Sequence, residues 1–531
     1  MNTQFFVNEP FSDFADPKER NALKDALDRV EQLRAAHKLI AQPIIGGIER
    51  STDSAVKRED PSMTQEELGT IHYGSTELAD EALTSLLAFQ PQWEATPVAT
   101  RAEMLQRAAN LMQERRHDLS ALIIREVGKP WKEADADVAE AIDFCRYYAE
   151  RALLFAAPIP TSDIPGEDNF LVYRPRGIAV VISPWNFPFA IACGMTVAAL
   201  VTGNATILKP AEQSSLVGFA LAQLLLEAGI PSRAFAYIPG AGEEIGRFLV
   251  SDPRVDMICF TGSRAVGQQI MMAAATPYPG QRSIKRVIAE LGGKNALIID
   301  EDADEDEAMR GILSSAFGFA GQKCSACSRL IVVGRQYDRF IERLVEAAAD
   351  LIVAPAKDPS AVIGPVVDAE AFARITATIE RARNVCRVEA AERQLMDGYF
   401  ISPTIIIDPP LSSEWWNEEI FGPVLCTTSA PSFEEALRIA LDSPYALTGG
   451  VFSRNPRNLE SARRHFTVGN LYLNRGITGA LVGRQPFGGS KMSGIGSKAG
   501  GPDYLLQFVE PRTITENTSR RGFVPEIGNI G

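Results

Sequence analysis

The sequence predicts an α/β protein built around parallel sheets, and three observations lead to this fold class. The chain has 531 residues, more than one hydrophobic core usually holds together, so we expect two large domains or a domain with insertions. Residues 1–150 show the apolar spacing of helices. From Arg176 onward, short apolar runs alternate with helix-length segments, which is typical of a parallel sheet covered on both faces.

Helices are expected throughout the first 150 residues. Apolar residues recur at helical spacing from Arg101 to Val127, and Gly128-Lys129-Pro130 then ends this predicted helix. A second helix is expected from about Ala134 to Leu153, because Val138 and Ile142 belong to one apolar stripe.

Strand-length apolar runs mark the first α/β region, at residues 177–183, 205–208, 235–238 and 256–260. Helices are expected from about Ser214 to Ala228, from Gly242 and from Ser263. Parallel sheets of this kind bind ligands at the carboxyl ends of their strands, so functional residues are expected there.

A second α/β region begins near Lys294 and extends to about Ala480. Its first strands are expected at residues 295–300 and 329–333. The tail from Tyr504 to Gly531 shows no core pattern of its own. We expect it to pack on another part of the molecule or on a partner subunit.

Composition and charge exclude several classes of protein. The formal net charge of −14 argues against a nucleic-acid partner, which needs clustered Lys and Arg, and against an anionic membrane surface. No apolar stretch reaches the ~18 residues that span a membrane. The N-terminal residues show neither a signal-peptide pattern nor the basic character of a transit peptide, so a cytoplasmic location is expected.

The seven cysteines and four histidines show no disulfide framework and no metal-ligand spacing. Several cysteines lie in apolar runs, which indicates reduced thiols in a reducing compartment. Cys324 and Cys327 form a C-x-x-C pair, but no second pair completes a zinc site, so no metal is predicted. We expect Cys327 to be a bystander, and a reversible disulfide with Cys324 is the alternative.

Glycine-rich segments after two predicted strands are candidates for a nucleotide site. Pro239-Gly240-Ala241-Gly242 precedes a helix that continues to Gly246, close to the dinucleotide fingerprint but with its third glycine one position late. An ordinary tight turn is the alternative. Phe260-Thr261-Gly262-Ser263 follows the next strand, where helix N-terminal amides and the Ser263 hydroxyl suit a pyrophosphate.

Pro210 cannot continue a central strand, so Lys209 and Glu212 are predicted at the rim of the same crevice. A Glu at this place accepts hydrogen bonds from ribose hydroxyls and repels a 2′-phosphate, which favours NAD over NADP. A solvated loop is the alternative.

The candidate nucleophile is Cys324, in the segment Gly321-Gln322-Lys323-Cys324-Ser325. A free cysteine has a pKa of ~8.5 and is only slightly ionised at neutral pH, so it needs positive charge nearby. Lys323 and a nicotinamide cation are the candidates for this charge.

Two further side chains suit carbonyl chemistry. Glu290 follows a predicted strand at residues 284–289, where its carboxylate could deprotonate a water. Asn186 lies within Pro184-Trp185-Asn186-Phe187-Pro188, where its amide could donate to an oxyanion. The alternatives are an ordinary strand-end Glu and a bare turn.

The ordered set of these segments resembles the aldehyde dehydrogenase superfamily. The matching motifs are PWNFP at Pro184, KPAE at Lys209, FTGS at Phe260, ELGGK at Glu290, GQKC at Gly321, EEIFGP at Glu418 and PFGG at Pro486. The resemblance covers nearly the whole chain. It implies an aldehyde dehydrogenase-like fold with a Rossmann-type cofactor domain, an α/β catalytic domain, and an oligomerisation hairpin with a C-terminal arm.

The resemblance also implies domain boundaries. Residues 1–150 and 176–290, together with 485–503, are expected to form the N-terminal helices and the NAD-binding domain. Residues 291–484 are expected to form the catalytic domain. Residues 151–175 and 504–531 are expected to form the oligomerisation flap, which implies a homodimer or a larger homo-oligomer.

Site residues follow from the resemblance position by position. It implies Cys324 as the nucleophile, Glu290 as the general base, and Asn186 as the oxyanion donor together with the Cys324 backbone N–H. The implied reaction passes through a thiohemiacetal and a thioester. The implied cofactor is NAD, and the matching positions are Ser183, Pro184, Trp185, Lys209, Glu212, Gly242, Gly246, Phe260, Thr261, Gly262, Ser263, Leu291, Glu419 and Phe421.

A narrower resemblance, at residues 8–10, 137–144, 321–325 and 474–480, is to the members that oxidise L-glutamate γ-semialdehyde in proline degradation. The implied substrate-binding residues are Ser325, Gly479, Ala480, Phe187, Phe487, Lys323 and Glu140. Another semialdehyde, such as succinate semialdehyde, is the alternative substrate. A functional link to a separate proline dehydrogenase is also implied.

Helical periodicity leaves the surroundings of Glu140 open. This residue lies opposite the stripe of Val138 and Ile142, where a solvated carboxylate is common. It shares its face with Phe144 and Tyr147, which indicates that something covers the face.

Overall fold

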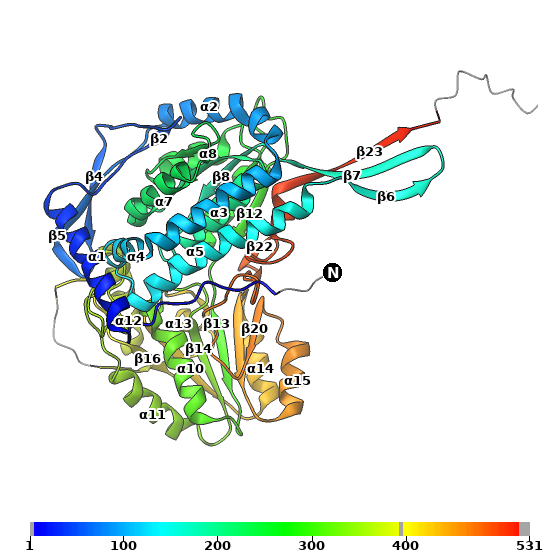
Figure 1. Cartoon of the computed structure of the whole chain (residues 1–531). Coiled ribbons are helices and arrows are strands. Elements are labelled where there is room, and N and C mark those ends of the chain that lie inside the picture. The colour runs from blue at the N-terminus through cyan, green and yellow to red at the C-terminus, as the bar shows by residue number, and fades with distance from the viewer. Residues whose placement is uncertain (1–4, 392–396, 520–531) are drawn as a thin grey trace, which may run out of the picture.

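Two large sheets form the centres of two layers (Figure 1). The computed structural model describes residues 5–391 and 397–519. The first sheet has eight strands in the order β22-β12-β11-β8-β9-β10-β2-β3, and the second has seven in the order β15-β16-β17-β14-β13-β19-β20. The strands from β12 to β10 are all parallel, so their carboxyl ends lie along one edge of the first sheet.

The strands of the first sheet are β2 (Ile44–Ile45), β3 (Ile48–Glu49), β8 (Ile178–Ile182), β9 (Ala205–Lys209), β10 (Phe235–Tyr237), β11 (Met257–Thr261), β12 (Arg286–Glu290) and β22 (Gly494–Ile495). Those of the second sheet are β13 (Asn295–Ile299), β14 (Cys327–Val333), β15 (Arg387–Ala390), β16 (Thr404–Ile407), β17 (Val424–Ala430), β19 (Thr448–Phe452) and β20 (Asn470–Leu473). The strands expected in both regions are present. The strand expected from residue 284 begins at Arg286, because Ile284 is 92% exposed and lies outside the sheet.

The two faces of β8 belong to different clusters of the core. Ala179 and Val181 pack in the cluster that includes α5 and α6, whereas Ile178 and Val180 pack in the cluster that includes α2, α8 and α9. This alternation is the side-chain period of a strand that is covered on both faces.

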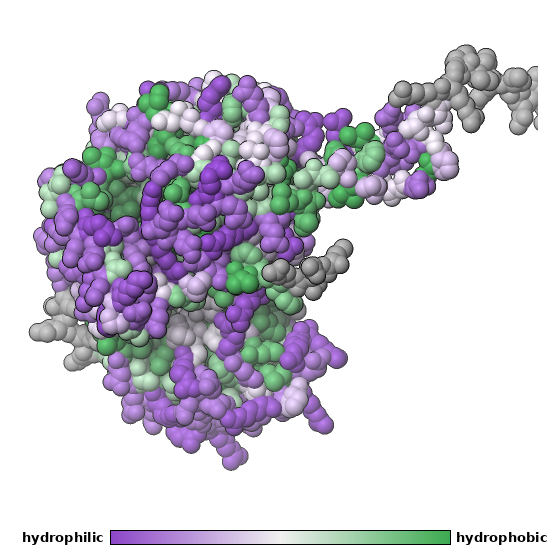
Figure 2. All heavy atoms as spheres, in the orientation of Figure 1, coloured by the Kyte–Doolittle hydropathy of each residue, from purple (hydrophilic) through white to green (hydrophobic). Residues whose placement is uncertain are grey.

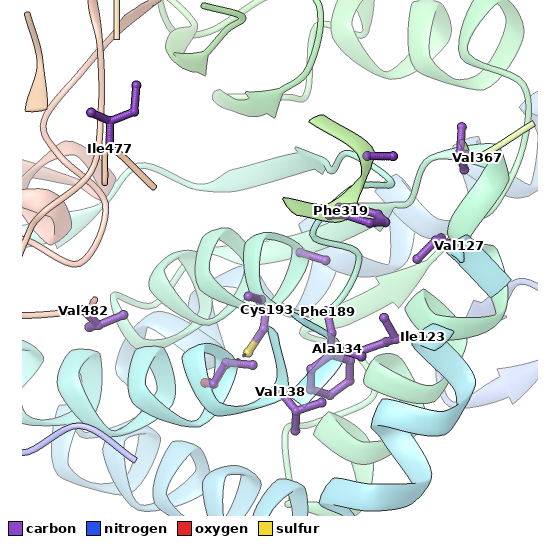
Figure 3. Close-up of a cluster of buried hydrophobic side chains, with 14 of the residues drawn as sticks. Ile123, Val127, Ala134, Val138, Phe189, Cys193, Phe319, Val367, Ile477 and Val482 are labelled. Atoms are coloured by element: carbon purple, nitrogen blue, oxygen red, sulfur yellow. Dashed lines mark hydrogen bonds between the residues drawn. The ribbon is translucent and has the colours of Figure 1, made fainter. Parts of the chain in front are cut away.

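The helices of the first layer are α1 (Pro17–Ala35), α2 (Thr76–Ala95), α3 (Val98–Glu114), α4 (Arg116–Val127), α5 (Trp131–Ala152), α6 (Ala190–Val201), α7 (Ser215–Glu227), α8 (Arg247–Ser251) and α9 (Arg264–Ala275). Those of the second layer are α10 (Glu305–Phe317), α11 (Tyr337–Ala349), α12 (Ala369–Arg383), α13 (Glu414–Asn417), α14 (Phe433–Leu441) and α15 (Pro456–His465). The close-up in Figure 3 shows how α4, α5 and the start of α6 pack around Ile123, Ala134, Val138 and Phe189.

Two expectations for the first 150 residues are wrong. The single helix predicted over residues 101–127 is divided into α3 and α4 at Arg115, because Arg116 turns inward and binds Asp135 at 2.6 Å. The apolar spacing continues on both sides of the break and therefore does not reveal it. Residues 40–72 contain β1 (Ile40–Ala41), β4 (Ala55–Asp60) and β5 (Met63–His72), which form a separate sheet. Their polar sequences show little hydrophobic periodicity.

A hairpin and the C-terminal strand project from the body (Figure 1). They are β6 (Ile159–Ile164), β7 (Glu167–Pro175) and β23 (Val509–Asn517), which pair in the order β23-β7-β6. In Figure 2 the helical face beside them is mainly hydrophilic, whereas the projecting sheet also displays hydrophobic side chains. Ile159, Ile164 and Ile514 are 41%, 49% and 38% exposed. Residues 520–531 of the predicted arm lie outside the described part of the chain.

The C-terminal segment is anchored before it projects. Tyr504 stacks on Tyr148 of α5, with ring centroids 5.5 Å apart, and Leu505 and Phe508 are buried. This agrees with the expectation that the tail packs on another part of the molecule. Within the described ranges, none of the helices is both long and apolar enough to cross a bilayer.

Replacing Ile298 with Ala tests the central position of β13. Ile298 is fully buried, so we expect the free energy of unfolding to fall by about 2–5 kcal/mol through lost burial and a cavity. Urea denaturation measures this change. The matched control is Ile284→Ala, at the exposed position beside β12, where a change of about 0.5 kcal/mol or less is expected. Equal effects at both positions contradict the assignment of the core.

Candidate active site

A cavity of about 150 Å³ lies where α5, the end of β12 and loops of the second layer meet. The predicted residues that line it are Glu140, Phe187, Thr261, Glu290, Lys323, Cys324, Ser325, Gly479, Ala480 and Phe487. The structure therefore brings together the predicted nucleophile, the predicted carboxylate and every substrate residue expected from the sequence.

The loop that carries Cys324 has an unusual backbone. It follows a turn of 3₁₀-helix at Gly318–Gly321, in which Phe319, Ala320 and Gly321 have φ values of 52°, 54° and 66°. A Cβ atom on Gly321 would lie 2.2 Å from the carbonyl oxygen of Gly422, so only glycine fits at this position. Left-handed residues persist where surrounding contacts hold them, and here they deliver the thiol to the cavity.

Burial, together with the nearby side chains of Glu419 and Glu290, raises the pKa of the Cys324 thiol to about 12. The expectation that Lys323 supplies the activating charge is wrong for this structure. Lys323 Nζ instead forms an ion pair with Glu133 of α5 at 2.6 Å. The charge of Lys323 is thus directed to Glu133, and the thiol, with its raised pKa, is mainly protonated at neutral pH.

Glu290 is the last residue of β12, and its Oε2 accepts the Gly489 N–H at 3.2 Å. Burial raises its pKa to about 8, while this hydrogen bond and the charge of Lys498 act in the opposite direction. Lys498 Nζ donates to the Gly469 carbonyl oxygen at 2.7 Å and also to that of Gly488. A carboxyl group with this pKa releases and accepts protons near neutral pH.

Asn186 is 4% exposed and reaches the nucleophile loop directly. Its Nδ2 donates to the Gln322 carbonyl oxygen at 3.0 Å, two residues before Cys324. The side chain of Gln322 is itself fixed, because it accepts the Val367 N–H at 2.9 Å and donates to the Pro365 carbonyl oxygen at 3.2 Å. The amide group of Asn186 thus lies beside the loop that bears the thiol.

The predicted cofactor residues lie along the carboxyl edge of the first sheet. Ser183, Pro184 and Trp185 follow β8, Lys209 ends β9, Phe260, Thr261, Gly262 and Ser263 follow along the end of β11, and Leu291 follows β12. Glu212 Oε1 accepts the Gly242 N–H at 2.6 Å and lies 3.3 Å from Lys209 Nζ. The helix expected from Gly242 begins as a π-helical turn, Gly242–Gly246, before α8.

These residues fit a dinucleotide. The hydroxyl of Ser183 is buried and has no hydrogen-bond partner among residues 5–391 and 397–519, so a polar group of a ligand can satisfy it. Ser263 caps the N-terminus of α9, where its Oγ accepts the Val266 N–H at 3.3 Å, and free amides at such a terminus suit a phosphate.

Glu419 and Phe421 lie close to the nucleophile from the side of the second layer. Glu419 Oε1 accepts the Gly293 N–H at 2.8 Å, and burial raises its pKa to about 7. Phe421 has a φ of 57°, and its ring lies 5.5 Å from that of Trp185. These two predicted cofactor residues are therefore joined to the carboxyl edge of the first sheet, Phe421 through Trp185 and Glu419 through Gly293.

Glu140 lines the cavity and is partly exposed. Burial raises its pKa to about 8, and Asp137 and Asp143 add to this shift. Phe144 and Tyr147 on the same face are 5% and 3% exposed, as the covered face predicted.

Sequence reasoning missed several residues at this site. Glu133 pairs with Lys323, and its one available signal was its place one helical turn before Asp137 on α5. Phe11 lines the cavity from an N-terminal arm that Asn8 holds by donating to Asp143 Oδ2 at 2.8 Å. No local pattern marks such a contact.

The fold and the family comparison agree on the class of protein. The aldehyde dehydrogenase family matches residues 48–514, and the chain belongs to this family. The resemblance and the α/β fold predicted from the sequence are confirmed.

Relatives of this chain have names that specify a substrate as well as the family. The chain is 47% identical over 515 residues to 1-pyrroline-5-carboxylate dehydrogenase of a Geobacillus species, covering 97% of this chain and 99% of that protein. It is 43% identical over 513 residues to 1-pyrroline-5-carboxylate dehydrogenase 2 of Bacillus subtilis, with coverage of 96% and 99%.

Solved structures of proteins with related names also match this chain. The 1-pyrroline-5-carboxylate dehydrogenase from Thermus with bound NAD matches with a TM-score of 0.94 and 44% identity, over 97% of this chain and all of that one. Proline utilization A from Bdellovibrio bacteriovorus matches with a TM-score of 0.95 and 46% identity, over 98% of this chain and 54% of that chain.

Alkylation of Cys324 by iodoacetamide tests the surroundings of the thiol. Its pKa is raised to about 12, so the rate should increase about tenfold for each pH unit from 7 to 9, as the thiolate fraction does. Glu419→Gln and Glu290→Gln remove charges that raise this pKa, so both should accelerate alkylation at pH 9. Peptide mass spectrometry separates Cys324 from the other cysteines.

Glu434→Gln is the matched control, because Glu434 is exposed on α14. It should leave the alkylation rate within about twofold of the unmodified protein. A rate that levels off below pH 8 contradicts the buried, protonated thiol.

Proposed function

We propose that this protein oxidises L-glutamate γ-semialdehyde, the open form of 1-pyrroline-5-carboxylate, to L-glutamate with NAD⁺ and water. The names of its relatives and the NAD bound by the Thermus protein support this assignment. The observation that carries it is the cavity in which a thiol, a carboxyl group with a pKa of about 8, and a set of polar groups meet. The runner-up is a dehydrogenase of another semialdehyde.

The first step is addition of the Cys324 sulfur to the aldehyde carbon. Because the thiol is protonated at neutral pH, a base must accept its proton, and the Glu290 carboxylate shares the cavity with it. The aldehyde oxygen becomes an oxyanion, for which Asn186 Nδ2 and the Cys324 backbone N–H are the donors. Donors fixed in advance stabilise such a charge without reorganising.

The chemistry that NAD⁺ would supply when bound is acceptance of the hydride of the adduct, which would leave a thioester on Cys324. Lys209, Glu212 and Ser263 would hold its ribose and phosphate end, and Glu419 and Phe421 the nicotinamide end. Once Glu290 has released the thiol proton to solvent, its carboxylate takes a proton from the water that attacks the thioester carbon. This proton passes to the Cys324 sulfur as it leaves, so both groups return to their starting states. The carboxylic acid is released from the cavity.

We assign recognition of the amino-acid end of the substrate to other residues that line the same cavity. The Ser325 hydroxyl and the backbone amides of Gly479 and Ala480 would hold the α-carboxylate, since amides donate without a mobile charge. Gly479 has a φ of 74°, which favours glycine in this loop. Phe187 and Phe487 would flank the aliphatic chain, and Glu140 would face the ammonium group.

The remaining assignments concern the whole chain. We assign residues 1–150, 176–290 and 485–503 to the cofactor domain, 291–484 to the catalytic domain, and 151–175 with 504–531 to an oligomerisation flap. Pairing of β22 with β12 in the first sheet supports the place of residues 485–503. The exposed isoleucines of the flap support a homodimer or larger homo-oligomer. A cytoplasmic location and a link to a separate proline dehydrogenase complete the proposal.

Formation of NADH at 340 nm tests the reaction. The protein should turn over with 1-pyrroline-5-carboxylate, and Cys324→Ala should lower kcat by at least about 10³-fold because no thioester forms. Cys327→Ala is the matched control and should keep full activity, since its buried thiol donates to the Arg329 carbonyl oxygen, away from the reacting atoms. A Cys324→Ala variant that retains turnover contradicts the mechanism.

Glu290→Gln should lower kcat by about 10²–10⁴-fold. In the unmodified protein, the Glu290 pKa of about 8 means that base catalysis increases with pH through that value, as the carboxyl group loses its proton. The pH profile of kcat should lose this limb in the variant, and intact mass should show the trapped acyl group if hydrolysis limits turnover.

Comparison of two aldehydes tests the substrate. We expect a kcat/KM at least about tenfold higher for glutamate γ-semialdehyde than for succinate semialdehyde, which lacks the ammonium group that Glu140 would bind. Glu140→Gln should remove most of this preference while changing succinate semialdehyde oxidation little. Glu150→Gln, at an exposed position of the same helix, is the control. A preference for succinate semialdehyde supports the runner-up instead.

A further inference from the structure

We propose that Lys129, paired with Asp137, is a positioning residue that holds the Asn186–Ala190 segment against the nucleophile loop. By sequence, Lys129 belongs only to the glycine-lysine-proline stop between α4 and α5. The inference rests on the proposed function, in which Asn186 stabilises the oxyanion. It adds the group that keeps Asn186 in place.

Lys129 contacts the segment at two points. Its Nζ donates to the backbone carbonyl oxygen of Asn186 at 2.9 Å. The same atom lies 3.6 Å from the centroid of the Phe187 ring, where a cation is attracted by the face of the aromatic group. One ammonium group therefore fixes the backbone of the oxyanion donor and the ring that lines the cavity.

Asp137 holds the other end of the segment. Its Oδ1 accepts the Ala190 N–H at 2.7 Å, at the first turn of α6, and its Oδ2 accepts a hydrogen bond from Lys129 Nζ at 3.0 Å. A carboxylate at a helix N-terminus is also favoured by the helix dipole. The ion pair thus spans the segment, with the cation on the Asn186 carbonyl and the anion on the Ala190 amide.

The pair also reaches the nucleophile loop. Lys129 Nζ lies 5.1 Å from the ring centroid of Phe319, one of the residues with positive φ that precede Cys324. Lys129 therefore contacts the loop that carries the oxyanion donor and the loop that carries the thiol.

The environment makes a purely stabilising role a poor explanation. The side chains of Lys129 and Asp137 are both 0% exposed, so both charges have lost their hydration. A buried ion pair of this kind often contributes little net stability compared with apolar residues of similar volume. Here the pair fixes the position of the backbone, because its polar atoms bind two defined backbone groups, one on each side of Phe187.

The test is a mutant cycle between this pair and Asn186. Lys129→Met with Asp137→Asn removes both charges at nearly constant volume, so no lone charge is left buried. We expect kcat to fall about 10–100-fold, with Asn186→Ala alone lowering it about 100-fold. Because the pair acts through Asn186, the triple variant should be no slower than Asn186→Ala. The KM for NAD⁺ and the alkylation rate of Cys324 should stay within about twofold.

Arg125→Met with Asp60→Asn is the matched control. It removes another buried ion pair, 2.6 Å long, that joins α4 to β4 and does not contact residues 186–190. It should lower thermal stability without the loss of kcat. Equal losses of kcat in the two double variants, or additive losses in the triple variant, overturn the proposal.

Hydrogen exchange gives a readout that does not depend on turnover. Amides 185–191 should exchange faster in the Lys129/Asp137 variant and unchanged in the control; unchanged exchange in both overturns the positioning role. Absence of turnover in the unmodified protein counts against the proposed function alone. If the double variant does not fold, Lys129→Gln with Asp137→Asn replaces it in the same cycle. Its amide can still donate to the Asn186 carbonyl, so its loss of kcat should be smaller, and combination with Asn186→Ala should again add no further loss to that of Asn186→Ala.

Discussion

The buried loop of Cys324 depends on side-chain amides that satisfy its backbone. Asn295 Nδ2 donates to the carbonyl oxygens of Cys324 and Ala326 at 2.7 and 2.8 Å, and its Oδ1 accepts the Thr448 N–H at 3.0 Å. In the same way, Asn186 Nδ2 donates to the carbonyl oxygen of Gln322 at 3.0 Å, and Gln322 Nε2 donates to that of Phe319 at 3.3 Å. The polar backbone groups of a buried loop cannot form hydrogen bonds with solvent water, so each of them needs a partner within the protein. These amides tie the loop to strands of the second sheet and to the end of β8.

The same burial determines the chemistry of the cavity. Burial raises the pKa of Glu140 and Glu290 to about 8, that of Glu419 to about 7, and that of Cys324 to about 12. Raised pKa values at all four groups mean that the site disfavours negative charge. Its thiol therefore stays protonated and unreactive until a base or a cation approaches. This links reactivity to the presence of substrate and cofactor. Perturbed groups concentrated in one cavity are also the physical mark of a functional site.

Much of the candidate site could be predicted because its residues follow strands. The ends of β8, β9, β11 and β12 are visible as the points where apolar runs stop, and parallel pairing brings those ends to one edge. The break at Arg115 and the strands between residues 40 and 72 could not be predicted in this way. The break leaves the apolar spacing of the two helices unchanged, and the strands show almost no apolar spacing. The sequence suggests Lys323 as the charge beside the thiol, whereas in the fold Lys323 pairs with Glu133 of α5, 190 residues away in the chain.

By itself, the sequence determined the fold class, the order of the chemical groups and the ends of the strands that bear them, because these depend on local spacing and on residue type. Only the tertiary structure decided which of those groups meet and in what state of charge. Lys129 illustrates the difference: beside Gly128 and Pro130 it is the end of a helix, and in the fold it joins Asp137 to the carbonyl of Asn186, 57 residues away. Burial and long-range pairing set hydrogen bonds and pKa values, and neither is a property of neighbouring residues in the chain.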